Sequence, residues 1–318
     1  MAPILKLVAQ RVALSLLLLL MVSVLIFAGT MILPGDVAQS ILGQSATPEA
    51  LANLRADLGL NDPPVTRYFQ WLWGALHGDL GTALTSGQDI TTAIGSRLSN
   101  TMFLAFWAAA ISVPLAIFLG LLAVRYQNRW PDKLISAFTL TSISIPEFLI
   151  GYVLMYLLAV KLRWFPSVAM INDSMSLGQK LNSIALPVTV LTLVVLAQMM
   201  RMTRAAILNV MQSAYIETAE LKGLTMFKII WRHAFPNSIS PIVNVVMLNL
   251  AYLVVGVVVI EVVFVYPGMG QYLVDHVSKR DVPVVQACGL IFAAVYIGLN
   301  MVADIVSILA NPRLRHPK

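Results

Sequence analysis

The sequence predicts an all-α integral membrane protein with six transmembrane helices, an extracytoplasmic insertion after helix 1 and a short cytoplasmic helix between helices 4 and 5. Three observations lead to this fold class. Hydrophobic residues fill 58% of the 318 positions and charged residues only 11%, well below the roughly 25% of a soluble domain. Apolar runs long enough to cross a membrane recur along the chain. The basic residues divide between the ends of those runs instead of forming one patch, so the net charge of +6 does not indicate nucleic-acid binding.

The first apolar run covers residues 12–33 and follows Lys6 and Arg11. A signal peptide is the alternative, but its apolar region would measure about 7–15 residues and end at a small-residue cleavage site. This run is about twenty residues long and ends in Leu33-Pro34-Gly35-Asp36 without such a site. We therefore expect residues 1–33 to form the N-terminus and a retained helix 1.

Residues 34–98 are expected to form the extracytoplasmic insertion. Thr47 is a suitable N-cap before a helix that starts at Pro48 and ends at Gly59. An amphipathic helix is predicted over residues 64–76, where apolar and aromatic residues recur at helical spacing. We expect its tryptophan and tyrosine rings to pack at the membrane interface rather than to stack on a ligand.

Five further spans complete the membrane domain, residues 99–310, which precedes a cytoplasmic tail, residues 311–318. The spans are expected at 100–124 with an interruption at Pro114, 134–160 with an interruption at Pro146, 184–200 with Pro187 in the first turn, 239–263 opened by Pro241, and 284–310. Six spans put both termini on one side of the membrane.

The charges indicate which side this is. Of the 21 lysines and arginines, 13 lie on the side of the termini, where only three acidic residues accompany them. The opposite side carries the other eight basic residues and nine acidic ones. Because basic residues concentrate in cytoplasmic loops, we expect both termini and the segment 201–238 to be cytoplasmic.

The segment 201–238 contains a polar stretch between helices 4 and 5. A helix is predicted up to Lys222, and Gly223 should end it because glycine adopts positive φ readily. A second short helix is predicted over residues 225–234. Pro236 is expected to end that helix because proline lacks an N–H group.

The first of these short helices has a face of small residues. Ile216, Ala219 and Gly223 share it, and charged residues surround it. Small side chains let another protein approach closely, so the pattern predicts a docking helix. A plain solvated loop is the alternative, but such a loop rarely carries apolar residues at helical spacing.

Three acidic residues fall within or near the ends of predicted spans. For Glu261 and Asp304, we favour a structural role in which each pairs with a basic residue. Glu147 follows Ser144 and Pro146, and a proline in a span frees backbone groups that need other partners. This polar stretch either lines a translocation path or binds helices together, and the sequence leaves both possibilities open.

Catalytic motifs are absent from the sequence. It contains no HExxH, GxSxG or GxxxxGK[ST] pattern, and its four histidines lack metal-ligand spacing. A membrane-bound enzyme is therefore disfavoured. A transporter built this way must either use an ion gradient, with Glu147 or Asp304 as the ion site, or borrow an ATPase.

The docking helix resembles the EAA loop of binding-protein-dependent ABC transporter permeases. Glu217-Thr218-Ala219, Gly223 and Pro236 keep the spacing of that motif, with Thr218 in place of an alanine and His233 at a usually apolar position. Further stretches resemble the B-type permease subunits of the dipeptide, oligopeptide and nickel branch. In chain order they are Leu33-Pro34-Gly35-Asp36, Gly78-Asp79-Leu80-Gly81, Ser144-Ile145-Pro146-Glu147-Phe148, Glu261-Val262-Val263-Phe264, Pro267-Gly268-Met269-Gly270, Arg280-Asp281-Val282-Pro283 and Asn311-Pro312-Arg313-Leu314-Arg315.

The resemblance implies the permease subunit of an ATP-driven importer in a bacterial inner membrane, translocating di- or oligopeptides or a similar small solute. It implies four partners: a second homologous permease and two ATP-binding subunits, which would bind ATP and Mg in place of this chain, and an extracytoplasmic substrate-binding protein. The residues implied in ATPase coupling are Glu217, Thr218, Ala219, Lys222, Gly223 and Pro236. A cytoplasmic coupling helix between helices 4 and 5 follows from the same resemblance.

Overall fold

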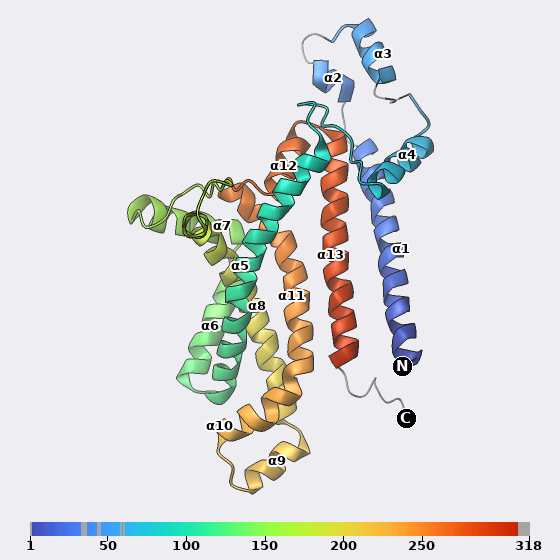
Figure 1. Ribbon diagram of the computed structural model, residues 1–318. Helices are drawn as coiled ribbons and strands as arrows, with labels where there is room; N and C mark the ends of the chain where they lie inside the picture. Colours follow the sequence, from blue (N-terminus) through green and yellow to red (C-terminus); the bar gives the residue numbers. More distant parts are fainter. Residues whose placement is uncertain (1, 33–36, 43–45, 58, 60, 311–318) are drawn as a thin grey trace.

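The computed structural model describes residues 2–32, 37–42, 46–57, 59 and 61–310 (Figure 1). Two predicted features, Leu33-Pro34-Gly35-Asp36 and the tail 311–318, lie outside the described residues. The regular structure of the described residues is helical apart from an isolated bridge between Thr82 and Asp89. The all-α prediction is confirmed.

Long apolar helices form the body of the molecule. They are α1 (Ala2–Ile32), α5 (Ile90–Arg125), α8 (Leu177–Met211), α11 (Phe235–Val263) and α13 (Val282–Ala310). Within the described residues, 5 helical stretches are long and apolar enough to cross a membrane, and a bent pair of helices raises the number to 6 if it counts as one span. The prediction of six spans agrees with the second count.

The bent pair takes the place of the predicted span at residues 134–160. The first helix, α6 (Trp130–Ser144), meets α7 (Glu147–Leu154) and its π-helical continuation η2 (Met155–Lys161) at an angle of 103°. Ile145 is extended (φ −98°, ψ 129°) because a residue that precedes proline avoids the helical region. The interruption predicted at Pro146 is therefore confirmed, and it is a sharp bend.

Three other prolines lie inside continuous helices. Pro114 is within α5, Pro187 within α8 and Pro241 within α11, so the predicted interruption at Pro114 and the predicted helix starts near Pro187 and Pro241 are wrong. Membrane helices tolerate proline where neighbouring groups satisfy the freed carbonyl. Two of these helices begin well before their proline, because Asp89 caps α5 and Ser176 caps α8.

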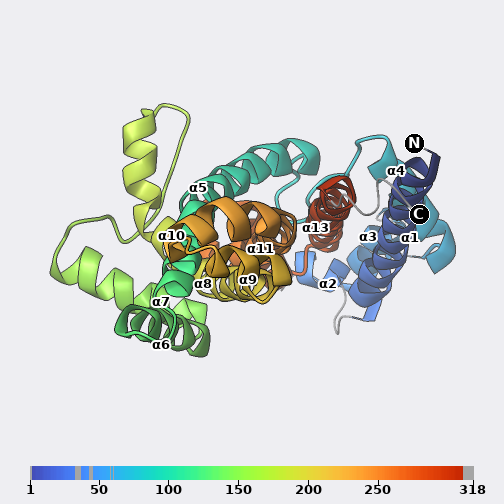
Figure 2. The same cartoon turned by 90° about the horizontal axis from the view of Figure 1, so that it is seen from below.

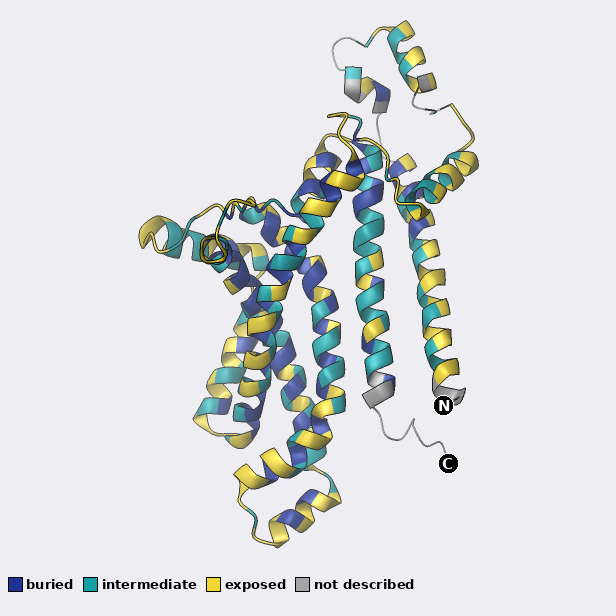
Figure 3. Ribbon diagram, in the orientation of Figure 1, coloured by how far each residue is buried: buried dark blue, intermediate teal, exposed yellow. Residues whose placement is uncertain are grey.

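The helices α5, α8 and α11 form the centre of the bundle. Their packing buries most of the main apolar core, including Leu104, Leu191 and Val257. α13 packs on α11, and α1 lies against the far side of α13 (Figure 2). Much of α1 is exposed (Figure 3), including Leu14 and Leu25. An apolar helix that no other helix encloses is suited to contact with lipid.

Short helices extend beyond both ends of the bundle (Figure 1). α2 (Val37–Leu42), α3 (Pro48–Asp57) and α4 (Pro64–Leu76) lie at one end, and α9 (Ala214–Leu221) and α10 (Met226–Ile229) lie at the other. The start of α1 and the end of α13 point toward the α9 end (Figure 1). The predicted domain boundary between residues 98 and 99 falls inside α5, which already begins at Ile90.

The helix predictions for the insertion are accurate. The Ala50 N–H donates to Thr47 Oγ1 at 3.2 Å, as an N-cap requires, and the predicted helix at residues 64–76 is α4. Tyr68 of α4 packs edge-on against Phe27 of α1. The opposite face of α4 is an exposed apolar stripe of Val65, Phe69, Trp73 and Leu76. Its placement at the membrane interface remains a prediction.

Candidate functional sites

The chain turns sharply after α9, at Gly223. This residue has a φ of +74°, its N–H donates to the Glu220 carbonyl at 2.8 Å, and the Leu224 N–H donates to the Ala219 carbonyl at 3.3 Å. These bonds satisfy carbonyl groups at the helix end, and the positive φ is unstrained because the residue is glycine. The predicted break at Gly223 is confirmed.

One face of α9 packs onto the chain itself. Ile216 and Ala219 are buried against Ile207 of α8 and against Ile229 and Ala234, which follow the turn. Two residues of the face predicted for docking, Ile216 and Ala219, therefore point toward the bundle, and only Gly223 is exposed. The small side chain of Ala219 lets α9 pack closely against the apolar core of this end of the bundle.

The opposite face of α9 is open. Glu217, Thr218 and Lys222 are exposed together with Gly223, where an added Cβ would meet nothing within 4 Å. Leu221 has the most exposed large apolar side chain of the described residues, at 83%. Four of the predicted coupling residues thus share one accessible surface, which we call the α9 tip (Glu217, Thr218, Leu221, Lys222 and Gly223).

Pro236 does not end the helix that follows the turn. α10 passes through a π-helical turn, η3 (Ile230–Ala234), directly into α11, in which Pro236 occupies the first turn. The prediction of a stop at Pro236 is wrong, since the helical run continues from η3 through Pro236 into α11. Only the turn at residues 222–225 therefore separates α9 from the helical run that continues into α11.

A buried ion pair braces this end of the bundle. Asp132 of α6 is 4% exposed, and Arg204 of α8 donates to its two carboxylate oxygens from Nε at 3.0 Å and Nη2 at 2.9 Å. The Asn128 N–H also donates to Asp132, at 2.9 Å. Sequence reasoning missed the pair. The signal available in the sequence was that Asp132 is the lone acidic residue in a strongly basic loop.

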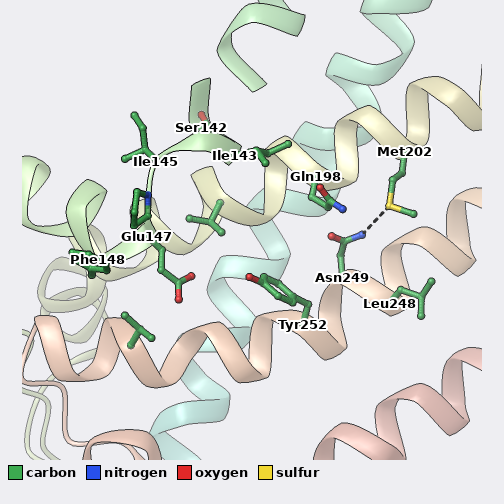
Figure 4. Close-up of a pocket in the computed structure, with 13 residues that line it drawn as sticks. Ser142, Ile143, Ile145, Glu147, Phe148, Gln198, Met202, Leu248, Asn249 and Tyr252 are labelled. Carbon is green, nitrogen blue, oxygen red and sulfur yellow. Dashed lines mark hydrogen bonds between the residues drawn. The ribbon is translucent and has the colours of Figure 1, made fainter. Parts of the chain in front are cut away.

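A cavity of about 680 Å³ lies between the α6–α7 bend, α8 and α11 (Figure 4). It is lined by Ser142, Ile143, Ile145, Pro146, Glu147, Phe148, Val194, Gln198, Met202, Leu248, Asn249, Tyr252 and Val259. Two of the three residues predicted to line a path, Pro146 and Glu147, are in this set. Ser144 is not, and its hydroxyl donates to the Leu140 carbonyl at 2.8 Å.

Among the described residues that line the cavity, Glu147 provides the only charge. Its carboxylate and the Tyr252 hydroxyl extend toward one another (Figure 4). Glu147 also lies beside Gly256 of α11, where an added Cβ would be 3.4 Å from its Oε2. The side chain therefore projects into the cavity instead of pairing with a neighbouring helix through a basic residue.

Glu261 is fully buried at the opposite end of the bundle from α9. Its Oε1 accepts from Thr101 Oγ1 at 2.6 Å, and its Oε2 accepts from the backbone N–H groups of Gly270 at 2.7 Å and Gln271 at 3.2 Å. The predicted structural role is confirmed, although the partners are neutral donors instead of a basic residue. Nearby, burial raises the pKa of Tyr266, whose hydroxyl donates to the Asn100 carbonyl at 2.7 Å.

The connection after Glu261 contains a helix that the sequence did not reveal, α12 (Met269–Ser278). It packs on α5 and α13. Farther along, Asp281 is buried and accepts from the Leu84 N–H at 3.1 Å and from the Thr85 N–H at 2.9 Å. Residues 264–283 are therefore an ordered part of this end, attached to the segment that precedes α5.

Asp304 forms an ion pair with Arg11, with 3.0 Å between the Arg11 Nη1 and the Asp304 Oδ2. A pairing with a basic residue is what the sequence predicted for it. The described residues contain no group of three or more His, Cys, Asp or Glu that could hold a metal ion.

Comparison with known proteins adds independent findings. A family model described as binding-protein-dependent transport system inner membrane component matches residues 112–316, and a model of the N-terminal part of such components matches residues 4–105. A putative peptide transport system permease protein of Brucella abortus (strain 2308) is 36% identical over 310 residues, covering 98% of this chain and 99% of that protein. The glutathione transport system permease protein GsiC of Salmonella typhimurium (strain LT2) is 34% identical over 298 residues, covering 94% and 95%.

A solved structure shares the fold. The MetNI methionine ABC transporter in an inward-facing conformation aligns with a TM-score of 0.50 at 16% identity, covering 70% of this chain and 96% of that chain.

Proposed function

Because this chain belongs to the family of binding-protein-dependent transport system inner membrane components and is a permease subunit of a bacterial ABC importer, we propose that it translocates di- or oligopeptides or a similar small solute. The observation that carries the proposal is the 36% identity to a putative peptide transport permease along 98% of the chain. Peptide and glutathione permeases both align over nearly their full length. Membership in this family also argues against the alternative function, an ion-coupled carrier.

The α9 tip is the proposed docking site for an ATP-binding subunit. Leu221 offers an apolar anchor, and Glu217 and Lys222 offer charges around it. Ala219 and Pro236 contribute indirectly, because Ala219 packs α9 onto the core and Pro236 lies where η3 joins α11. A movement of the docked subunit would reach α11 directly. ATP and Mg belong to the two partner ATPases in this arrangement.

A second, homologous permease is the proposed partner for the open side of α11. Exposed residues Leu248, Tyr252, Val255, Val259 and Val262 recur at helical spacing along it. Three of them, Leu248, Tyr252 and Val259, also line the cavity. A partner packed on this stripe would close the cavity into a path bounded by both subunits, with Pro146 and Glu147 in its wall.

The end that carries α2, α3, α4 and α12 is proposed to face the outside and to receive the substrate-binding protein. The segment 34–98 and the loop 264–283 meet there, joined through Asp281 and Thr85. Both termini and the α9 tip would then be cytoplasmic, and the excess of basic residues at that end supports this orientation.

Cysteine labelling tests this orientation. Cys288 is the single cysteine of the sequence and is buried, so an introduced thiol would dominate labelling by a membrane-impermeant maleimide. In intact spheroplasts, Glu49→Cys should label and Lys222→Cys should label only after the membrane is opened. The reverse pattern contradicts the orientation.

Purification and uptake test the function. In mild detergent the chain should co-purify with an ATP-binding subunit, and proteoliposomes of the complex with the binding protein should accumulate peptide only with ATP. Gly223→Glu should abolish this uptake while the chain stays inserted, because the added side chain obstructs docking and because a φ of +74° strains the turn for any residue but glycine. Purification without an ATPase, or normal uptake by the variant, refutes the docking proposal.

A further inference from the structure

The cavity beside α11 has the chemistry of a cation site. None of its described lining residues is Lys, Arg or His, and Glu147 is the one acid among them. Glu147 is the first residue of α7, a position that favours a negative side chain. An unpaired charge at membrane depth is costly. The described lining residues of this chain do not neutralise the Glu147 carboxylate, so it is available to a positively charged ligand.

The neighbouring polar groups Asn249 and Tyr252 add hydrogen-bond acceptors. Asn249 donates from Nδ2 to the Val245 carbonyl at 2.8 Å and contacts Met202 Sδ at 4.0 Å, so its Oδ1 is the atom left for a ligand. Tyr252 is 54% exposed, and its hydroxyl extends toward Glu147 (Figure 4). The oxygen of a tyrosine hydroxyl can accept a hydrogen bond from an ammonium group.

Gln198 provides a hydrogen-bond donor on another part of the cavity wall. Gln198 accepts from Arg201 Nη2 at 3.2 Å through Oε1, which leaves its amide N–H groups available. The cavity thus offers acceptors at Glu147 and Asn249 and a donor at Gln198. A volume of about 680 Å³ lies in the usual range of small-molecule sites, roughly 300–1,000 Å³.

We propose that Glu147, with Asn249 and Tyr252, binds the ammonium group of the solute during its passage, and that Gln198 faces the solute's carbonyl or carboxylate groups. The inference rests on the proposed importer function and narrows its substrate to solutes with a primary amine, such as peptides with a free N-terminus.

Binding of matched probes tests it. The complex of this chain with its partner subunits is purified in detergent without the binding protein, and saturation-transfer NMR measures the affinity of Ala-Phe, Ala-Phe amide and N-acetyl-Ala-Phe. Wild type should bind the first two at least tenfold more tightly than the acetylated probe, because a hydrogen bond to a charged group is worth about one to two factors of ten. Glu147→Gln should lose this preference, and Glu147→Asp should keep it.

Asp173→Asn is the matched control, since it makes the same carboxylate-to-amide change in an exposed loop outside the cavity, and it should bind as wild type does. The inference is overturned if wild type binds none of the probes, if it binds Ala-Phe and its acetylated form equally, or if Glu147→Gln weakens all probes alike, as a contact with the second permease would. ATP-driven uptake in proteoliposomes of the same complex, with the binding protein now added, separates the importer function from this inference. Absence of uptake in wild type refutes the importer function, whereas uptake without amine preference in binding refutes this inference alone.

Discussion

The hydroxyl of Thr101 donates a 2.6 Å hydrogen bond to Glu261 Oε1, joining α5 to the end of α11. The same hydroxyl accepts from the Met269 N–H at 2.9 Å, so α12 begins on this pair. Both side chains are fully buried. Glu261 is buried and accepts hydrogen bonds from neutral donors of α5 and α12, so it holds this end of the bundle together. A solute has no access to its carboxyl group.

Gly268→Ala should destabilise this end through volume. A Cβ at position 268 would lie 2.0 Å from Glu261 Oε1, whereas the backbone (φ −98°) is open to any residue. Overpacking of this kind costs roughly 1–3 kcal/mol, and we expect a lower melting temperature of the purified complex. Gly178→Ala, where nothing lies within 4 Å, is the control. Equal melting temperatures for the two variants would contradict the argument.

Leu221→Asp should uncouple the ATPase. The Leu221 side chain is 83% exposed, so the substitution leaves the fold of this chain intact and places a charge where an apolar anchor is proposed. We expect at least a tenfold loss of ATP-driven uptake and less co-purified ATPase, since a buried apolar anchor is worth about 2 kcal/mol or more. Asn209→Asp adds the same charge at an exposed position on α8 and should retain uptake. Full activity of Leu221→Asp would exclude this residue from the interface.

Arg204→Met alone should destabilise the complex more than replacement of both Arg204 and its partner Asp132. The variant leaves the carboxylate of Asp132 buried without its bidentate partner, which costs roughly 3 kcal/mol, the lower end of the range for buried pairs, because the Arg204 side chain keeps 27% exposure. The double variant Asp132→Leu/Arg204→Met should recover part of the loss. Thermal unfolding of the complexes measures both. Arg129→Met, at an exposed position before α6, should have little effect, and a similar loss there would remove the special role of the pair.

Local signals in the sequence predicted much of this structure. Thr47, Gly223 and the residue before Pro146 act through backbone conformation, which depends on a few neighbouring residues, and each was placed correctly. Helix interruptions and ends were wrongly predicted at Pro114, Pro187 and Pro236. A long helix held by tertiary packing accommodates a proline that would end an isolated helix.

Partnerships between distant residues could not be read in this way. Glu261 and Thr101 are separated by 160 positions, and the cavity combines residues from the α6–α7 bend, α8 and α11. The sequence pointed to Glu147 through its unusual polarity, but Asn249 and Tyr252 were indistinguishable from ordinary span residues until the helices were assembled.

Asp304→Asn should leave transport nearly unchanged, which distinguishes ATP coupling from ion coupling. Asp304 pairs with Arg11 at 3.0 Å, and their side chains are 43% and 51% exposed. Exposed ion pairs of this kind contribute roughly 0–1 kcal/mol to stability, so loss of the Arg11–Asp304 pair should weaken only the contact between α1 and α13. In proteoliposomes, ATP-driven peptide uptake by Asp304→Asn should stay within about twofold of wild type and should persist when a protonophore collapses the proton gradient. An assembled Asp304→Asn complex that no longer transports, or wild-type uptake that the protonophore abolishes while ATP remains, would restore the ion-coupled alternative.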